Sequence, residues 1–259
     1  MMLNMIVTGG ESTGTGLPPV LLAHGLFGSA RNLGGLARRL AGTRRVVLVD
    51  MRNHGDSPRD PDHGYPALAG DLAEVIASQG GCADVVGHSM GGKAAMMLAL
   101  TRPQLVRRLV ALDIAPWAYG HSQTALIDAM EAVDLSTVQR RAEADAQLAR
   151  HVADPGVRGF LLQSLDLRSS PPRWKLNLPV LRRNMDRLVG WPPETPKGTF
   201  RGPALFLAGE TSDYCRGPQI EAIRAHFPQA EIRVIPGAGH WLHADRPHET
   251  AEAVAAFLG

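Results

Sequence analysis

Short apolar runs, each about as long as one β-strand, recur in the N-terminal and C-terminal parts of the chain. They occupy residues 19–24, 45–50, 83–86, 108–113, 203–208 and 231–235, and a weaker run at 3–7 fits an edge strand. Near-continuous apolar runs are typical of parallel strands that are buried on both faces. Segments with helical spacing follow most of these runs, at residues 32–40, 66–78, 93–100, 218–227 and 247–258. This alternation predicts an α/β fold in which helices cover both faces of a mostly parallel sheet.

The alternation stops after Pro116 and resumes at about residue 197. No buried strand is evident between these points, where the pattern is helical at residues 123–133, 136–152 and 178–188. A separate helical domain is the alternative, but it would interrupt the sheet between two strands. We therefore expect residues 1–116 and 197–259 to form the core, and residues 117–196 to be a helical lid inserted at the carboxyl edge of the sheet. Ligands bind at that edge in open α/β sheets.

The stretch from Asp84 to Lys93 combines a strand, the pentapeptide Gly87-His-Ser-Met-Gly91 and the start of a helix. In this context G-x-S-x-G is a nucleophile elbow, a turn so sharp that it strains the serine and exposes its hydroxyl. The two glycines let the strand and the helix approach each other without Cβ clashes. A serine that only caps a helix is the alternative. Both glycines and both flanking elements favour Ser89 as a catalytic nucleophile.

A serine hydroxyl needs a base, and that base needs an orienting acid. Of ten histidines, His240 is the predicted base, because it lies in a Gly-rich loop directly after the last predicted strand. We expect packing or structural hydrogen bonds for His243, His88 and His54. The predicted chain order Ser, acid, His is the order of G-x-S-x-G hydrolases. The base must be neutral to act, so activity should rise with pH where histidine loses its proton.

Two aspartates could supply the acid. Asp113 ends the strand next to the central one, whereas Asp213 follows a later strand at the more common chain position, in a loop one residue longer than the usual Gly-x-x-Asp. Both loops leave the same edge of the sheet, and the residues alone do not decide between them.

The oxyanion of an acyl-transfer intermediate needs two preorganised donors. The N–H of Met90, directly after Ser89, is one candidate. The second is the N–H of Leu26, in the His-Gly-Leu loop that follows the strand at 19–24. Only backbone groups donate here, so the apolar side chains are no objection.

The composition argues against several classes of partner and site, and it adds no further candidate catalytic residue. A formal charge of +2 over 259 residues gives no reason to expect nucleic acid or a membrane surface as a partner. Cys82 and Cys215 lie far apart and outside metal-ligand spacing, which favours reduced thiols over a disulfide or a metal site. We expect a soluble cytoplasmic protein, because no signal peptide and no apolar run of membrane-spanning length is evident. The oligomeric state is not predicted.

Several stretches together resemble the α/β-hydrolase superfamily, and more closely the small bacterial carboxylesterase/thioesterase group related to abhydrolase-domain-11 proteins. These stretches are residues 24–29, 50–58, 87–93, 113–116 and 239–244. The resemblance implies the α/β-hydrolase fold with a helical lid, and hydrolysis of a small-molecule ester or thioester with a short to medium acyl chain. It also implies no metal and no cofactor. Relatives in this group tend to lack an acid in the loop where Asp213 lies, which favours Asp113.

Other functions remain compatible with the same residues. A lipase, a C–C bond hydrolase and a cofactor-free haloperoxidase use the same triad, and a non-catalytic small-molecule-binding protein can use the same fold. Arg52, Asn53 and Asp56 are expected to be structural. Lid residues that could line the substrate pocket are Trp117, Trp174, Leu178 and Trp191.

Overall fold

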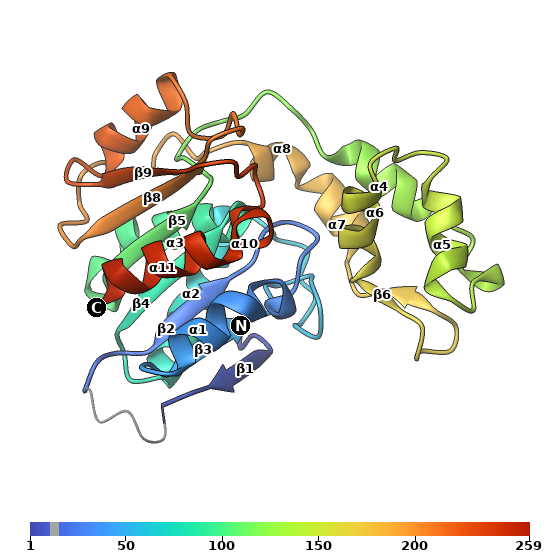
Figure 1. Ribbon diagram of the computed structural model, residues 1–259, viewed down its shortest axis with the longest axis horizontal. Helices are drawn as coiled ribbons and strands as arrows, with labels where there is room; N and C mark the ends of the chain where they lie inside the picture. Colours follow the sequence, from blue (N-terminus) through green and yellow to red (C-terminus); the bar gives the residue numbers. More distant parts are fainter. Residues whose placement is uncertain (11–15) are drawn as a thin grey trace.

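The computed structural model describes residues 1–10 and 16–259 of the chain (Figure 1). Its main sheet has seven strands in the order β1-β3-β2-β4-β5-β8-β9. Only β1 runs antiparallel to its neighbour, β3; the other neighbouring strands are parallel. The strands are β1 (Met5–Thr8), β2 (Val20–Ala23), β3 (Val46–Val49), β4 (Ala83–His88), β5 (Val106–Leu112), β8 (Ala204–Gly209) and β9 (Glu231–Ile235). The mostly parallel α/β sheet expected from the apolar runs is confirmed.

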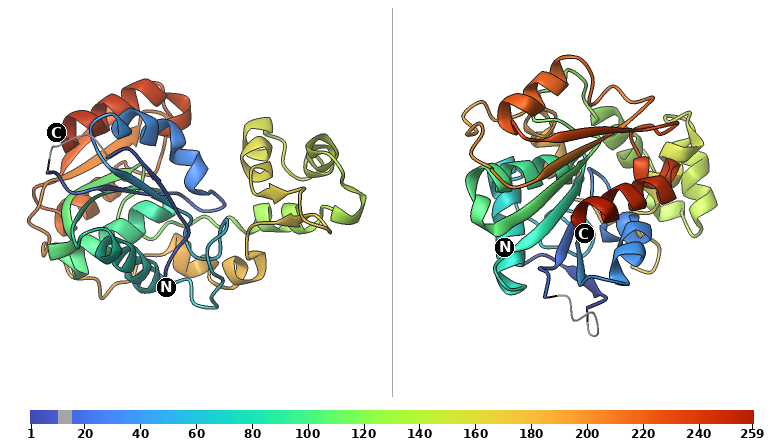
Figure 2. Two further views of the ribbon diagram at one scale, coloured as in Figure 1. Left: turned by 90° about the horizontal axis from the view of Figure 1, so that it is seen from below. Right: turned by 60° about the vertical axis from the view of Figure 1, so that its left-hand side comes forward.

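Alternation of side chains along the inner strands separates two apolar layers. Val20 and Leu22 of β2 face one layer, and Leu21 between them faces the other. Helices α1 (Gly34–Ala41) and α11 (Pro247–Leu258) cover the first face. Helices α2 (Tyr65–Ser78), α3 (Met90–Thr101) and α9 (Pro218–His226) cover the second (Figure 2). Both faces of the inner strands are therefore buried from solvent, as their continuous apolar sequence requires.

The segment between β5 and β8 is mostly helical. It contains α4 (Thr124–Glu131), α5 (Arg141–Leu148), α6 (Pro155–Leu162), α7 (Leu178–Arg183) and α8 (Met185–Val189). Helix α8 lies between the sheet and the other helices of the segment (Figure 1).

The remaining helical elements of the chain are short. They are the 3-10 turns η1 (Ala30–Leu33), η2 (Pro103–Leu105) and η3 (Leu135–Thr137), and the four-residue helix α10 (Leu242–Asp245) before α11.

Parts of this segment differ from the expected helical pattern. The helix predicted at 136–152 is interrupted, because the side chain of Asp134 caps η3 through the Ser136 N–H, and α5 begins only at Arg141. A two-stranded hairpin of β6 (Leu165–Asp166) and β7 (Arg173–Trp174) was also missed, since strands of two residues have no period to detect.

The loop at the carboxyl end of β3 fastens this segment to the core. Lys175 Nζ lies 2.7 Å from Asp56 Oδ1. Asn177 donates its backbone N–H to Asn53 O at 2.9 Å and its side-chain amide to Asn53 Oδ1 at 2.9 Å. The expected structural roles of Asn53 and Asp56 thus include anchoring the inserted segment, while Arg52 forms a buried fork with Asp71 at 2.6 and 2.8 Å.

Within the described residues, no helix combines the length and apolar character needed to cross a membrane. Both cysteines, Cys82 and Cys215, are free thiols.

Candidate active site

Ser89 lies in the tight turn that joins β4 to α3, with φ 49° and ψ −116°. This positive φ is strained for a residue with a side chain. The surrounding glycines are required by close backbone contacts. A Cβ on Gly87 would lie 2.3 Å from Gly91 O, and one on Gly91 would lie 2.4 Å from Ala23 O. The elbow predicted from the G-x-S-x-G motif therefore has the expected geometry, with the serine presented at the carboxyl edge of the sheet.

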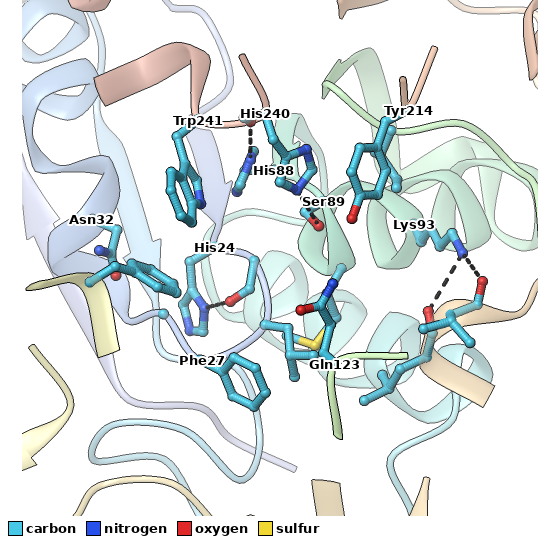
Figure 3. Close-up of a pocket in the computed structure, with 18 of the residues that line it drawn as sticks. His24, Phe27, Asn32, His88, Ser89, Lys93, Gln123, Tyr214, His240 and Trp241 are labelled. Carbon is cyan, nitrogen blue, oxygen red and sulfur yellow. Dashed lines mark hydrogen bonds between the residues drawn. The ribbon is translucent and has the colours of Figure 1, made fainter. Parts of the chain in front are cut away.

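His240 follows β9 and points its ring at Ser89 (Figure 3). Its Nε2 lies 3.1 Å from Ser89 Oγ, and its Nδ1 lies 2.7 Å from Asp113 Oδ2. Because a carboxylate can only accept, Nδ1 carries the proton and Nε2 is left to accept from the serine hydroxyl. Three side chains from three separate loops thus form one hydrogen-bonded chain.

The two candidate acids occupy very different places. Asp113 has no exposed surface, and its carboxylate also accepts from the Gly209 N–H at 2.8 Å and from the Ser212 hydroxyl. The side chain of Asp213 is 94% exposed and its nearest cation is Arg216, at 3.6 Å. The structure therefore brings Asp113, and not Asp213, to His240.

Ser212 was missed by the sequence reasoning, although a signal for it was present. Strand β8 ends at Gly209, so Ser212 stands where the acid of a Gly-x-x-Asp loop would be. The extra residue moves Asp213 to the surface and aims the Ser212 hydroxyl at the Asp113 carboxylate.

Other rings fix His240 from both sides. Tyr214 stacks on it with a centroid distance of 4.0 Å and an interplanar angle of 19°. His88 lies on its other side at 4.8 Å, and its Nε2 is 2.9 Å from His240 O. Burial lowers the pKa of His88 well below that of a free histidine, so it is a neutral donor to that carbonyl. His243 packs edge-on against His88, and burial lowers its pKa to about 4.

The loop between β2 and η1 is fixed by two further histidines. His24 Nε2 accepts from the Met51 N–H at 2.9 Å, and His54 Nε2 accepts from the Phe27 N–H at 3.2 Å. Burial lowers the pKa of both rings, which keeps these nitrogens free of protons. Leu26 of this loop and Met90 both line the cavity at Ser89. Met90 is the first residue of α3, so its N–H has no carbonyl within the helix to donate to.

A cavity of about 140 Å³ adjoins Ser89. At one end its walls include the half-exposed Asn32, Phe160 and Trp241. At the other end they include the buried Lys93 (Figure 3). The buried Tyr65 lies at the same end, with its ring 5.5 Å from Lys93 Nζ. In the described part of the chain, no group of three or more His, Cys, Asp or Glu side chains is arranged to hold a metal ion.

The four lid residues expected to line this cavity do not do so. Trp174 is buried inside the inserted segment, where its Nε1 donates to Met130 O at 2.9 Å, and Leu178 is buried nearby. Trp117 packs against the core and Trp191 contacts His226. Their apolar surface therefore stabilises packing. The inserted segment contributes other residues to the cavity, namely Tyr119, His121, Gln123, Leu126, Phe160, Leu188 and Val189.

Comparison with known proteins agrees with this geometry. Residues 20–253 match the model of the Alpha/beta hydrolase family. The chain is 43% identical to the sn-1-specific diacylglycerol lipase ABHD11 of Mus musculus, over 93% of this chain and 81% of that protein. It is 42% identical to Esterase YbfF of Escherichia coli (strain K12), over 93% of this chain and 92% of that protein.

A solved structure, a marine microorganism esterase, superimposes with a TM-score of 0.93 at 35% identity, covering 99% of each chain. A solved thioesterase domain from the curacin biosynthetic pathway, at 20% identity and a TM-score of 0.71, shares the fold. The chain therefore belongs to the alpha/beta hydrolase family, as an esterase/lipase-like member.

Proposed function

We propose that this protein is a serine hydrolase that cleaves carboxylic esters or thioesters of short to medium acyl chains through an acyl-enzyme. The observation that supports this most directly is the continuous hydrogen-bonded chain from Ser89 through His240 to Asp113 beside a cavity. The Ser-His-Asp constellation performs acyl transfer on several unrelated folds, so the geometry argues for the chemistry independently of the family.

In the first step, His240 Nε2 takes the proton from Ser89 Oγ as that oxygen attacks the ester carbonyl carbon. The N–H groups of Leu26 and Met90 donate to the oxyanion that develops. His240 then gives its proton to the departing alcohol or thiol, which leaves the acyl group on Ser89. Water, deprotonated by the same histidine, attacks the acyl-enzyme and releases the acid. Asp113 remains ionised and stabilises the imidazolium in each half-reaction.

The preference for shorter acyl chains rests on the size and lining of the cavity. At about 140 Å³ it is similar to the roughly 150 Å³ apolar cavities that hold one benzene molecule. Leu126, Leu188 and Val189 give part of its wall an apolar surface suited to an acyl chain. We also propose that residues 117–196 act as a lid, since they supply these walls from outside the core.

The decisive experiment is intact-mass analysis after treatment with a fluorophosphonate, which phosphonylates an activated serine. It is run on the wild type and on Ser89→Ala, together with hydrolysis of p-nitrophenyl acetate, butyrate and octanoate. We expect one adduct per chain and ester turnover in the wild type, and neither in Ser89→Ala. A folded wild type with no adduct and no turnover would contradict the proposal and favour a binding protein.

Substrate type separates the remaining enzymes. A C–C bond hydrolase would leave plain esters intact. A lipase would be activated at an oil–water interface, whereas we expect turnover of dissolved short esters without an interface. The same assay with acyl thioesters of equal chain length compares thioester with ester cleavage.

A further inference from the structure

A second cleft, of about 460 Å³, lies behind the buried end of the cavity at Ser89. Its walls come from the start of α2 and from residues 186–194, and include Pro66, Trp191 and Pro192. Among the described residues, Tyr65 alone lines both hollows. Tyr65 therefore stands between the cavity at the candidate nucleophile and a larger cleft that is open to solvent, beside Lys93, which lines the cavity, and Gly190, which lines the cleft.

Tyr65 is fixed firmly in this position. It is the first residue of α2, its side chain is 1% exposed, and its hydroxyl donates to Leu188 O at 2.6 Å. The ammonium of Lys93 lies 5.5 Å from its ring and donates to Val189 O at 2.9 Å and to Gly190 O at 2.7 Å. Both side chains thus bind the carbonyls at the end of α8, which prevents the ring from swinging aside.

This barrier is close to the nucleophile. Lys93 is one helical turn beyond Ser89, and its N–H donates to Ser89 O at 3.0 Å. One turn of an α-helix advances by roughly 5 Å. An acyl chain that enters this end of the cavity from Ser89 would therefore meet the Tyr65 ring and the aliphatic part of the Lys93 side chain after a short distance.

The two ends of the cavity differ in solvent exposure, as an acyl transfer requires. The leaving group must escape while the acyl group stays, so the leaving group needs the open end. Asn32, Phe160 and Trp241 are half-exposed, whereas Tyr65 and Lys93 are each 1% exposed. Resting on the proposed function, we propose that Tyr65 is the end wall of the acyl-binding arm and limits acyl-chain length. The second cleft is the space that a longer chain would enter if the wall were removed.

Tyr65→Ala tests this proposal, with kcat/KM measured on p-nitrophenyl butyrate, octanoate and laurate. We expect the laurate-to-butyrate ratio to rise about tenfold or more, because even one methylene placed in or excluded from an apolar pocket changes kcat/KM by roughly 10–200-fold. Tyr65→Phe keeps the ring and loses only the hydroxyl, so it should keep the wild-type ratio within about twofold. Thermal melting of each variant establishes that it is folded.

Pro192→Ala is the matched control, because Pro192 lines the second cleft and not the cavity at Ser89. Trp191 is unsuitable for this purpose, since its ring packs against Tyr65 at a centroid distance of 6.0 Å. We expect Pro192→Ala to leave the chain-length ratio unchanged. A shift of the ratio in Pro192→Ala alone would mean that acyl chains already reach the second cleft, which would contradict the role of Tyr65 as the end wall. A folded Tyr65→Ala variant that hydrolyses the butyrate ester with an unchanged laurate-to-butyrate ratio would also contradict this role of Tyr65.

If Tyr65→Ala does not fold, Tyr65→Leu removes the far half of the ring and is judged by the same ratio. Failure of the proposed function is distinct from failure of this inference. It would appear as absent butyrate turnover in the wild type, before any variant is compared.

Discussion

Two residues of the candidate triad share an unusual backbone conformation. Ser89 has φ 49° and Asp113 has φ 50°, a region that side chains rarely adopt. Each follows a strand directly, and each is tied to the next strand of the sheet. The Ser89 N–H donates to Leu112 O at 3.2 Å, and the Asp113 N–H donates to Leu207 O at 2.7 Å. The sheet therefore imposes the strain that turns both side chains toward His240.

Asp113→Asn should lower kcat by about 10⁴-fold, because an amide cannot hold His240 in the tautomer that frees Nε2. Asp213→Asn is the matched control and should keep wild-type activity, since that side chain lies at the surface. Steady-state hydrolysis of p-nitrophenyl butyrate by both variants measures the difference. Equal losses in the two variants would contradict the assignment of the acid to Asp113.

The residue types of the site were largely predictable, but one choice between them was not. Ser89 and His240 occur in motifs whose spacing already defines a turn, and the structure brings them together at 3.1 Å. The choice between Asp113 and Asp213 as the acid depended on one extra residue in the loop after β8. That residue changes the direction in which the Asp213 side chain points, and the sequence pattern does not reveal this change. Tyr214 gave no sequence signal, because its stacking on His240 joins loops that are distant in the chain.

At the scale of elements, the strands of the main sheet were predictable from the sequence, whereas the helices of the inserted segment were predictable only in part. Buried parallel strands have continuous apolar runs, which are hard to mistake. The predicted helix at 178–188 instead divides into α7 and α8 around Asn184, whose side-chain amide donates to Val180 O at 3.0 Å and to Pro61 O at 3.2 Å. Such a break depends on a tertiary contact, and helical periodicity does not report it.

Helix α3 approaches β2 so closely at Gly91 that a larger residue there should destabilise the protein. Gly91→Ala would place a Cβ 2.4 Å from Ala23 O, and we expect a loss of about 1–3 kcal/mol in the free energy of unfolding. Gly70, inside α2, faces open space in the direction that a Cβ would take, with no atom within 4 Å of it. Gly70→Ala should therefore stabilise the protein by up to about 1 kcal/mol. Urea denaturation of both variants measures the contrast, and similar effects in the two would refute the close approach of α3 and β2.

At the scale of the whole molecule, buried neutral histidines link the loops around the site. His24, His54, His63 and His88 are each at most 4% exposed, and burial lowers the pKa of all four. Above pH 6.5 these rings are neutral in both the folded and the unfolded chain. Below it the unfolded chain binds protons that the folded protein does not, so stability falls as pH falls.

For His63, whose pKa is lowered to about 4, this loss continues down to about pH 4 and reaches roughly 3 kcal/mol. We expect the melting temperature to fall steadily between pH 6.5 and 4, measured by circular dichroism. His63→Asn should reduce this slope, and His151→Asn, at an exposed position, should not. A melting temperature that is constant across this range would show that the buried histidines do not resist protonation.

The position of Asp113 directly after β5 has a consequence for building chimaeras. The inserted segment begins at residue 117, only a few residues beyond this aspartate. The short stretch between them is held to the segment, because the Ala115 N–H donates to Tyr119 Oη at 3.0 Å and the Tyr119 N–H donates to Val189 O at 2.9 Å. A hydrolase with its acid after β8 could exchange this segment for a foreign one without touching the triad. Here the graft boundary must lie beyond Tyr119, or the transplant will also displace the acid.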